Sequence, residues 1–440
     1  MTARPSWYGD PSPAQHRALR KLAALPAGNQ FTTALASQAA GRQVSAIIPT
    51  YNRCPFDPAD RMTDNPLYWA VTTLRGQAGG VLAEIIVADD GSSDHTPAVL
   101  DQLAASGHPV PVRQVRSPDH QGAWQARNAG AAAAQGSLLY FADDDCAFPP
   151  HAVAGAACAL ALMREDDPAA AAVNTPFYYR ALRPRAVLPA SRIGTLDVEA
   201  ATFSTGFHAM PSGYLDGRPP VLGPAGLLRP LRVQLIGGTA LIDAGALRAA
   251  GGFADLSAWA TGYSDHLHLS ADLAAAGAHL YHCPDPRLGA AHLKFGAAGA
   301  YPLDHGDLDA AVGALGRPLG DLVALSAVPR ADSGHRVADG EFFREQIGSF
   351  FAFFAARSLA GGRAWAVRSW EEFAVGGQVP TLAVGGVPGP AERALAWREG
   401  LAAGAGTLVR SARHGLARDV AEGLLREVCD ACGQPAVTGW

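Results

Sequence analysis

Short β-branched runs alternate with helical segments over residues 44–166, and this alternation limits the fold more strongly than any other feature of the 440-residue sequence. Strands are expected at four runs, VSAIIPT (44–50), EIIVADD (84–90), VPVRQVR (110–116) and SLLYFA (137–142). Helices are expected between and after them, at about 67–77, from 96, at 123–134 and after 150. Strands separated by helices form βαβ units, whose strands pair in parallel and are buried on both faces. The sequence therefore predicts an α/β fold that binds its ligand at the carboxyl ends of a mostly parallel sheet.

Acidic side chains gather at this edge of the predicted sheet. Asp89 and Asp90 end the second run, and Asp143, Asp144 and Asp145 follow the fourth run in the stretch LLYFADDDCAFPP. Three ionised carboxylates a few ångströms apart repel one another, so at least one takes up a proton unless a cation compensates them. Mg²⁺ and Mn²⁺ prefer oxygen ligands and are often shared with substrate phosphates. An acidic turn in water is the alternative, and the position after a buried strand makes us favour a metal site.

The acidic pair at the end of the second run also has a structural alternative. In this alternative to ligand binding, Asp89 or Asp94 caps a turn or a helix in the stretch VADDGSSDHTP. We expect Thr96 to be the N-cap of the helix that begins with Pro97. A base or a ribose with hydrogen-bond donors is the natural partner for Asp90.

Composition and missing motifs exclude several classes of protein. The formal net charge is −5, whereas a nucleic-acid-binding protein needs a basic face to neutralise phosphates. Six scattered cysteines fit a reducing compartment better than a disulfide framework. We see no signal peptide and no run of roughly 20 apolar residues that would cross a bilayer, so we expect a soluble, cytoplasmic protein. GxGxxG, Walker A and GxSxG motifs are also missing, so dinucleotide sites, phosphate loops and hydrolase nucleophile elbows have no support.

Four segments in a fixed order resemble glycosyltransferase family 2 proteins with the GT-A fold. They are PTYNR (49–53), IIVADDGSSDHT (85–96), QGAWQARNAGAAAAQG (121–136) and YFADDDCAFP (140–149). The resemblance runs from about residue 44 to 164, and the order and spacing of the segments are more specific than any one of them. It implies a nucleotide-diphosphate-sugar donor, most often a uridine nucleotide, and Mn²⁺ or Mg²⁺ as cofactor.

The resemblance also implies which residues of this chain bind the donor and the metal. The expected donor-binding residues are Pro49, Thr50, Tyr51, Asn52, Arg53, Asp90, Arg127, Asp143 and Asp144. Asp145 is our first choice for the direct metal ligand, with Asp143 or Asp144 in contact with the ribose or a water on the metal, and Asp143 as a second metal residue. Arg127 would brace the diphosphate or the aspartates, and a surface arginine on a helix is the alternative. His292, in LGAAHLKFG, falls where many GT-A enzymes place a histidine near the metal, so it is a further candidate ligand.

Two later segments resemble the acceptor side of the family, LIGGTALIDAGALRAAGGF (235–253) and AWATGYSDHLHLSADLAAAG (258–277). The second usually carries a Glu-Asp pair, but here Ser264 replaces the glutamate and Asp265 occupies the aspartate position. In inverting members that aspartate is the general base that removes the proton of the acceptor. The alternative for Asp265 is an aspartate favoured by the dipole at a helix N-terminus.

The remaining sequence suggests three regions. We expect an N-terminal extension (1–43), a catalytic domain (44–300) with a nucleotide-sugar half (44–164) and an acceptor half (165–300), and a mostly helical C-terminal region (301–440). The helical stretch FFREQIGSFFAFFAARSLAGG (342–362) predicts a buried helix or a homodimer interface, with an apolar acceptor pocket or a peripheral membrane contact as the alternative. An additional loop at 54–66 would cover the donor or shape specificity. The QxxRW element of processive synthases is missing, which indicates a single transfer per encounter.

Together these features predict a metal-dependent, inverting, non-processive glycosyltransferase. It would move a sugar from a nucleotide diphosphate, with UDP favoured, to a hydroxyl or an amine of a small-molecule or glycan acceptor. One alternative is a non-catalytic module that binds a nucleotide or a glycan, because Ser264 departs from the family pattern. The other is a sugar nucleotidyltransferase, but PTYNR is not the glycine-rich, basic phosphate loop that such an enzyme needs.

Overall fold

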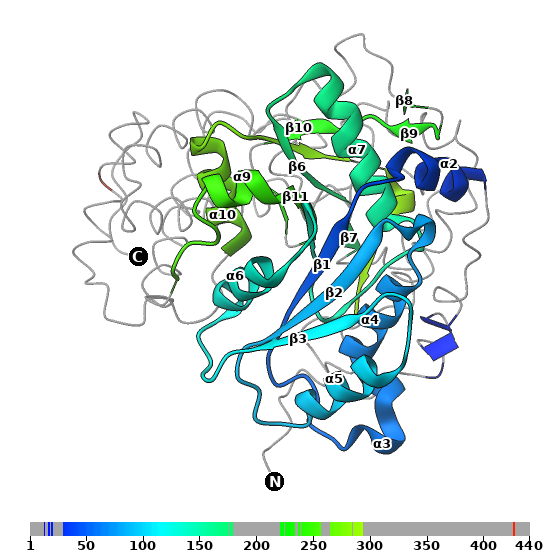
Figure 1. Cartoon of the computed structure of the whole chain (residues 1–440), viewed down its shortest axis with the longest axis vertical. Coiled ribbons are helices and arrows are strands. Elements are labelled where there is room, and N and C mark those ends of the chain that lie inside the picture. The colour runs from blue at the N-terminus through cyan, green and yellow to red at the C-terminus, as the bar shows by residue number, and fades with distance from the viewer. Residues whose placement is uncertain are drawn as a thin grey trace, which may run out of the picture. The chain divides into compact units, whose positions relative to one another are not determined.

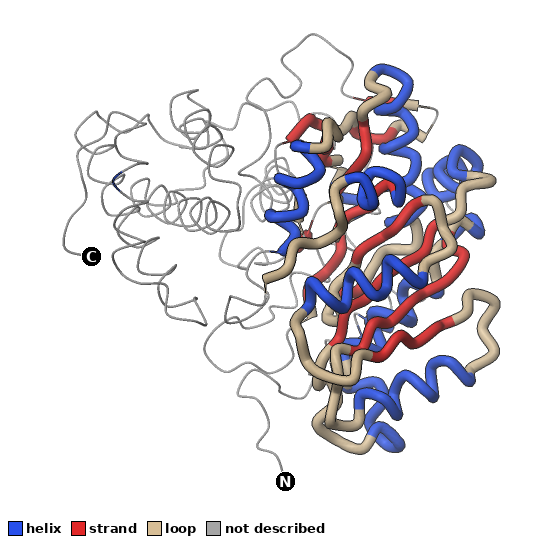
Figure 2. Tube along the Cα trace, turned by 60° about the vertical axis from the view of Figure 1, so that its left-hand side comes forward, coloured by secondary structure: helices blue, strands red, loops and turns tan. Residues whose placement is uncertain are grey.

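The structure, a computed structural model, describes residues 30–175, 177–178 and most of 221–293, with a few isolated residues elsewhere (Figures 1 and 2). The chain divides into two compact units, residues 1–254 with 269–327, and residues 255–268 with 328–440. Nearly all described residues belong to the first unit. The predictions for the C-terminal region, including the aromatic stretch at 342–362, lie outside the described residues.

The first unit is built around an eight-stranded sheet with the order β10-β12-β6-β11-β4-β1-β2-β3 (Figure 1). Its strands are β1 Val44–Thr50, β2 Leu82–Asp89, β3 Val112–Arg116, β4 Leu138–Phe141, β6 Ala170–Asn174, β10 Leu231–Val233, β11 Ala240–Asp243 and β12 His279–His282. The strands β4, β1, β2 and β3 pair in parallel, as do β6 and β12. Strand β11 runs antiparallel between β4 and β6, and β10 is antiparallel to β12. The predicted α/β fold with a mostly parallel sheet is confirmed.

Helices cover both faces of this sheet, which gives three layers (Figures 1 and 2). The larger helices are α2 Gln30–Ala39, α4 Pro66–Arg75, α5 Thr96–Ala105, α6 Ala123–Ala133, α7 Ala152–Asp166, α9 Ala244–Ala249 and α10 Asp265–Ala275. All seven residues of β1 are buried, and their alternation divides the interior into two cores. Ala46 and Ile48 pack with α2, α4, α5 and α7, whereas Ile47 packs with α6, α9 and the residues Leu269 and Leu273 of α10.

Several shorter elements complete the described part of the chain. They are α3 Pro58–Arg61, β5 Cys146–Ala147, β7 Phe177–Tyr178, β8 Val221–Leu222, β9 Leu227–Leu228, β13 Ala290–His292 and the 3₁₀ turns Met62–Asp64, Ala78–Gly80 and Pro286–Leu288. Strands β5, β13 and β7 form a second sheet in that order, and β8 and β9 form a third. Among the helices that the structure describes, none has the length and apolar character needed to cross a bilayer.

One prediction about local structure is wrong. Thr96 is the first residue of α5 and not its N-cap, because it follows the capping position of His95. The backbone N–H of Thr96 instead donates to Oδ1 of Asp94 (2.9 Å). The Thr96 hydroxyl accepts from the N–H of Arg53 (2.7 Å), so it joins the end of β1 to the start of α5.

The segment 54–66, predicted to be an additional loop, contains α3 and a 3₁₀ turn. The N–H of Cys54 donates to Oδ2 of Asp94 (2.7 Å), which ties the start of the segment to the turn after β2. Asn65 closes the segment as the N-cap of α4, where its Oδ1 accepts from the N–H of Leu67 (2.9 Å). The segment is therefore anchored at both ends, and its role over the donor stays a prediction.

Candidate functional site

The polar residues predicted from sequence come together where the parallel strands end. Register pairs Thr50 with Asp89 across β1 and β2, and Ile47 with Phe141 across β1 and β4. The carboxyl ends of these three strands therefore lie side by side, and the aspartates 143–145 follow the end of β4 directly. This edge is where open α/β sheets bind ligands.

Two of the three aspartates are buried. Asp144 is 4% exposed and Asp145 is 9% exposed, whereas the side chain of Asp143 is 30% exposed. Arg53 contacts both buried carboxylates, with its Nη2 at 2.5 Å from Asp144 Oδ1 and 3.3 Å from Asp145 Oδ2. The Thr50 hydroxyl donates to the other oxygen of Asp144, Oδ2, at 2.7 Å. A solvated acidic turn is therefore the wrong interpretation for Asp144 and Asp145.

Arg127 reaches the third aspartate from helix α6. Its Nη2 lies 2.7 Å from Asp143 Oδ1, and its guanidinium carbon lies 5.8 Å from the centre of the Phe253 ring. Arg127 is 6% exposed, so the alternative of a surface arginine is wrong. The close approach of α6 to β1 depends on Gly130, where a Cβ atom would lie only 2.6 Å from Ile47 Cγ2. Glycine at this position lets the helix bring Arg127 to the aspartates.

Burial and charge set the protonation of this cluster. Burial raises the pKa of the Asp144 carboxyl, and the Arg53 guanidinium opposes that shift. Burial also raises the pKa of the Cys146 thiol well above its ordinary value, and the charges of the three aspartates raise it further. The thiol is therefore protonated at neutral pH.

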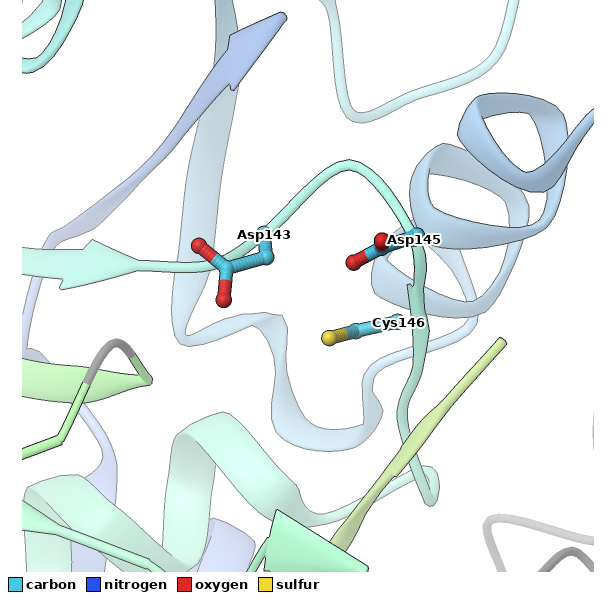
Figure 3. Close-up of side chains that lie close together, drawn as sticks. All are labelled: Asp143, Asp145 and Cys146. Carbon is cyan, nitrogen blue, oxygen red and sulfur yellow. The ribbon is translucent and has the colours of Figure 1, made fainter. Parts of the chain in front are cut away.

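The cluster contains a donor set that suits a divalent ion. One oxygen of Asp143, one oxygen of Asp145 and the Cys146 sulfur all lie within 4.8 Å of one another, and Figure 3 shows these three side chains along the turn that follows β4. Asp144 does not belong to this donor set, and its two oxygens contact Thr50 and Arg53. Two carboxylates fit Mn²⁺ or Mg²⁺, whereas the protonated Cys146 thiol is a poor ligand for either ion.

His292 is placed beside the aspartates by its backbone. Strand β13 pairs antiparallel with β5, and the register sets His292 opposite Cys146. The N–H of Leu293 donates to the carbonyl oxygen of Asp145 at 2.5 Å. The structure describes only the backbone of His292, so its role as a ligand stays a prediction.

Asp90 forms a second polar centre, at the end of β2. It is 2% exposed, its Oδ1 accepts from the N–H of Gln121 (2.9 Å), and its Oδ2 accepts from the N–H of Gly122 (2.7 Å). The Nδ1 atom of His120 lies 2.7 Å from the same Oδ2. The imidazole of His120 also stacks on Tyr51, with ring centres 3.8 Å apart and planes inclined by 16°. Tyr51 and Asp90, predicted to bind the donor, are thus joined by a residue that the sequence did not single out.

Asn52 and Asp89 have structural contacts. Asn52 adopts a positive φ of 49°, its Oδ1 accepts from the N–H of Ser93 (2.8 Å), and its own N–H donates to the Ser92 hydroxyl (2.9 Å). Asp89 Oδ1 accepts from the N–H of Ser92 (2.9 Å). The turn-capping alternative for Asp89 is confirmed. Pro49, also expected at the donor, is the next-to-last residue of β1 and lies opposite Ala88.

Three buried polar side chains near the aspartates were not predicted from sequence. Asn174 ends β6, Thr175 follows it, and Thr239 precedes β11, which lies between β6 and β4. Within the described part of the chain, the Asn174 amide and the Thr239 hydroxyl have no hydrogen-bond partner, whereas the Thr175 side chain bonds to the hydroxyl of Tyr140. A buried polar group without a partner costs about 1–3 kcal/mol, so such groups are expected to bind water or a ligand.

Gly91 offers a test of how the 119–122 loop is held over Asp90. It has a φ of +76°, and a Cβ atom there would lie 2.9 Å from the carbonyl carbon of Asp119 and 3.1 Å from the nitrogen of His120. We expect Gly91→Ala to lower the free energy of unfolding by about 2–4 kcal/mol, because backbone strain adds to the steric overlap. Gly107→Ala is the control, because Gly107 has a φ of +65° and a Cβ atom added to it would meet no atom within 4 Å. If urea denaturation gave the same loss of unfolding free energy for both variants, the 119–122 loop would be able to move away from the added methyl group without strain.

Asp265 is the first residue of α10 and is 3% exposed. Its Oδ1 accepts from the N–H of His266 (2.8 Å), and Nδ1 of His266 lies 3.4 Å from the same oxygen. Asp265 belongs to the second unit, and Ser264 lies outside the described residues. Its role as the base stays a prediction.

Comparison with known proteins assigns the class of this domain. The family model Glycosyl transferase family 2 matches residues 45–206, which include Tyr51, Asp90, Arg127 and the aspartates 143–145. The chain therefore contains a domain of glycosyltransferase family 2, a family of enzymes, and the resemblance inferred from the four segments is confirmed.

Two curated relatives each match about a quarter of the chain. Glycosyltransferase AglD of Haloferax volcanii is 35% identical over 112 residues, which are 26% of this chain and 17% of AglD. An uncharacterized glycosyltransferase of Haemophilus influenzae is 33% identical over 107 residues, 24% of this chain and 31% of that protein. The chain thus spans less than a third of the length of these relatives.

Solved structures with a related arrangement are more distant. GalNAc-T7 with UDP, GalNAc and Mn²⁺ has a TM-score of 0.40 at 14% identity, over 72% of this chain and 59% of that one. The mannosyltransferase PcManGT of Pyrobaculum calidifontis, with GDP-Man and Mn²⁺, has a TM-score of 0.39 at 18% identity, over 84% and 97% of the two chains.

Proposed function

We propose that this chain is a metal-dependent, inverting glycosyltransferase that transfers a sugar from a UDP-linked donor to a hydroxyl or an amine of a small-molecule or glycan acceptor. The observation that carries the proposal is the cluster at the end of β4, where two arginines from distant segments contact three consecutive aspartates. It lies in the family 2 domain and at the ligand-binding edge of the sheet.

Asp143 and Asp145 would hold the divalent ion, with His292 as a further ligand. When bound there, Mn²⁺ or Mg²⁺ would neutralise the charge that develops on the leaving diphosphate. The guanidinium groups of Arg53 and Arg127 are near enough to bind diphosphate oxygens and to orient the leaving group. Their present contacts with the carboxylates keep the cluster together before the donor arrives.

Asp265 would act as the general base. Its carboxylate would take the proton of the acceptor hydroxyl or amine as that group attacks the anomeric carbon opposite the diphosphate, which inverts the configuration. Asn174 and Thr239 are proposed to contact hydroxyl groups of the sugar or the acceptor, because their side chains are buried and have no hydrogen-bond partner among the described residues. A single transfer fits the missing QxxRW element.

A nucleotide-sugar screen tests the proposal. The thermal unfolding temperature would be measured with UDP-, GDP-, CDP- and ADP-linked sugars, each with Mn²⁺ and with EDTA, and release of the nucleotide would be followed. We expect stabilisation and nucleotide release with a UDP-sugar and Mn²⁺ only. Stabilisation by UDP that survives EDTA would contradict the metal site. Formation of a nucleotide sugar and pyrophosphate from a nucleoside triphosphate and a sugar phosphate would identify a nucleotidyltransferase instead.

A further inference from the structure

Arg53 contacts two carboxylates of the aspartate cluster although it belongs to a different strand connection. It lies three residues after the end of β1, and its Nη2 is 2.5 Å from Asp144 Oδ1 and 3.3 Å from Asp145 Oδ2. Asp145 is also part of the donor set that suits a divalent ion. The guanidinium and the ion therefore compensate the same carboxylate, and each weakens the attraction of that carboxylate for the other.

The charges around the three aspartates are already close to balance. Arg53 contacts Asp144 and Asp145, and Arg127 Nη2 lies 2.7 Å from Asp143. Two guanidinium groups leave at most one of the three carboxylate charges uncompensated. An ion that arrived alone would meet this small negative charge and two cations, whereas an ion that arrived with a diphosphate would bring further negative charge with it. We therefore expect the cluster without a donor to bind Mn²⁺ weakly.

Arg53 is better placed than Arg127 to change partners. Its backbone is held, because its N–H donates to the Thr96 hydroxyl (2.7 Å). Its side chain is 18% exposed, whereas that of Arg127 is 7% exposed. Asp144 also accepts from the Thr50 hydroxyl (2.7 Å), and that bond does not involve the guanidinium. Movement of the Arg53 side chain therefore leaves both the end of β1 and Asp144 with a hydrogen bond.

We infer that Arg53 couples the binding of the divalent ion to the binding of the donor. Without a nucleotide, its guanidinium takes the place of the ion beside Asp145. When the ion and a nucleoside diphosphate bind together, the guanidinium turns from the carboxylates to the diphosphate oxygens. The coupling is reciprocal, so the nucleotide and the ion raise the affinity for each other by the same factor. This inference rests on the proposed function and deepens it.

The test is a titration of the full chain with Mn²⁺, in which electron paramagnetic resonance measures the free ion without UDP and with saturating UDP. The variants are Arg53→Gln and the matched control Arg113→Gln, whose arginine pairs with Glu84 near the start of β2 (2.6 Å). Without UDP, we expect Arg53→Gln to bind Mn²⁺ about 10-fold more tightly than the wild type and the control. We expect UDP to tighten Mn²⁺ binding about 100-fold in the wild type and the control, but only about 10-fold in Arg53→Gln.

The direction of the change separates this role from a structural one. An arginine that only held the cluster together would, when removed, leave a distorted site that binds Mn²⁺ less tightly than the wild type does. The variant Arg53→Gln/Asp144→Asn removes one charge of each sign, so it replaces Arg53→Gln in the titration if that variant does not fold. It too should bind Mn²⁺ more tightly than the wild type without UDP, because Asp145 has lost the competing guanidinium.

Two results would overturn the inference, and they differ in what they mean for the proposed function. If the variants without Arg53 have the Mn²⁺ affinity of the wild type and the same response to UDP, the inference is wrong and the proposed function stands. If the wild type binds no Mn²⁺ even with UDP present, the metal-dependent use of a UDP-linked donor fails, and the inference fails with it.

Discussion

Replacing Asp265 by asparagine is expected to lower the rate of sugar transfer by about 10²–10⁴-fold, because an amide cannot take the proton of the acceptor. Asparagine keeps the side-chain oxygen that accepts from the N–H of His266, so the start of α10 is preserved. Loss of a charge at a helix N-terminus costs only about 0.3–1 kcal/mol of stability. The measurement is the initial rate of UDP release with acceptor, or with water as acceptor, at a saturating donor concentration.

The affinity for UDP separates a base from a donor-binding residue. We expect Asp265→Asn to bind UDP and Mn²⁺ as the wild type does, because a base for the acceptor makes no bond to the nucleotide. Asp272→Asn, two turns further along α10, is the matched control and should keep the wild-type rate. Full activity in Asp265→Asn would rule out the assignment of the base. A joint loss of rate and of UDP binding would move Asp265 to the donor side.

Much of the nucleotide-binding half of the fold could be predicted because its signals are local. The run 44–50 matches β1 in full, and α6 ends within one residue of its expected boundary. These elements combine β-branched or alanine-rich sequences with clear turn residues at their ends. The position of strand β11 between β4 and β6 could not be predicted, because the pairing of strands about 100 and about 70 residues apart leaves no signal in a single sequence.

The site could be predicted in its residue types but not in its contacts. The order of the four segments identified the aspartates, Arg53 and Arg127, yet no local pattern showed that Arg53 bridges Asp144 and Asp145. His120 was missed because the segment used for the resemblance starts at Gln121, one residue later. It stacks on Tyr51, 69 positions earlier in the chain, and only the fold brings the two rings together.

The second large effect is expected at Arg53. Its guanidinium contacts two carboxylates that are nearly buried, so Arg53→Gln leaves both without this positive charge. Removing one partner of a buried ion pair typically lowers stability by about 3–5 kcal/mol. We expect urea denaturation in the presence of EDTA to show that Arg53→Gln has lost unfolding free energy of this order relative to the wild type. Mn²⁺ should restore much of it, because a divalent ion between Asp143 and Asp145 supplies positive charge to the same cluster.

A matched control distinguishes this effect from the general loss of an ion pair. Arg113 Nη1 lies 2.6 Å from Oε2 of the buried Glu84, which also accepts from the Ser45 hydroxyl (2.7 Å) and the N–H of Gln135 (2.8 Å). Arg113→Gln should be less destabilised than Arg53→Gln, since the Ser45 and Gln135 donors to Glu84 remain. Mn²⁺ should raise its unfolding free energy no more than it raises that of the wild type. Equal stabilisation of both variants by Mn²⁺ would show that the ion binds elsewhere. A larger gain for Arg53→Gln alone would mean that the arginine and the metal compensate the same carboxylates, so that Arg53 is released toward the diphosphate when the ion binds.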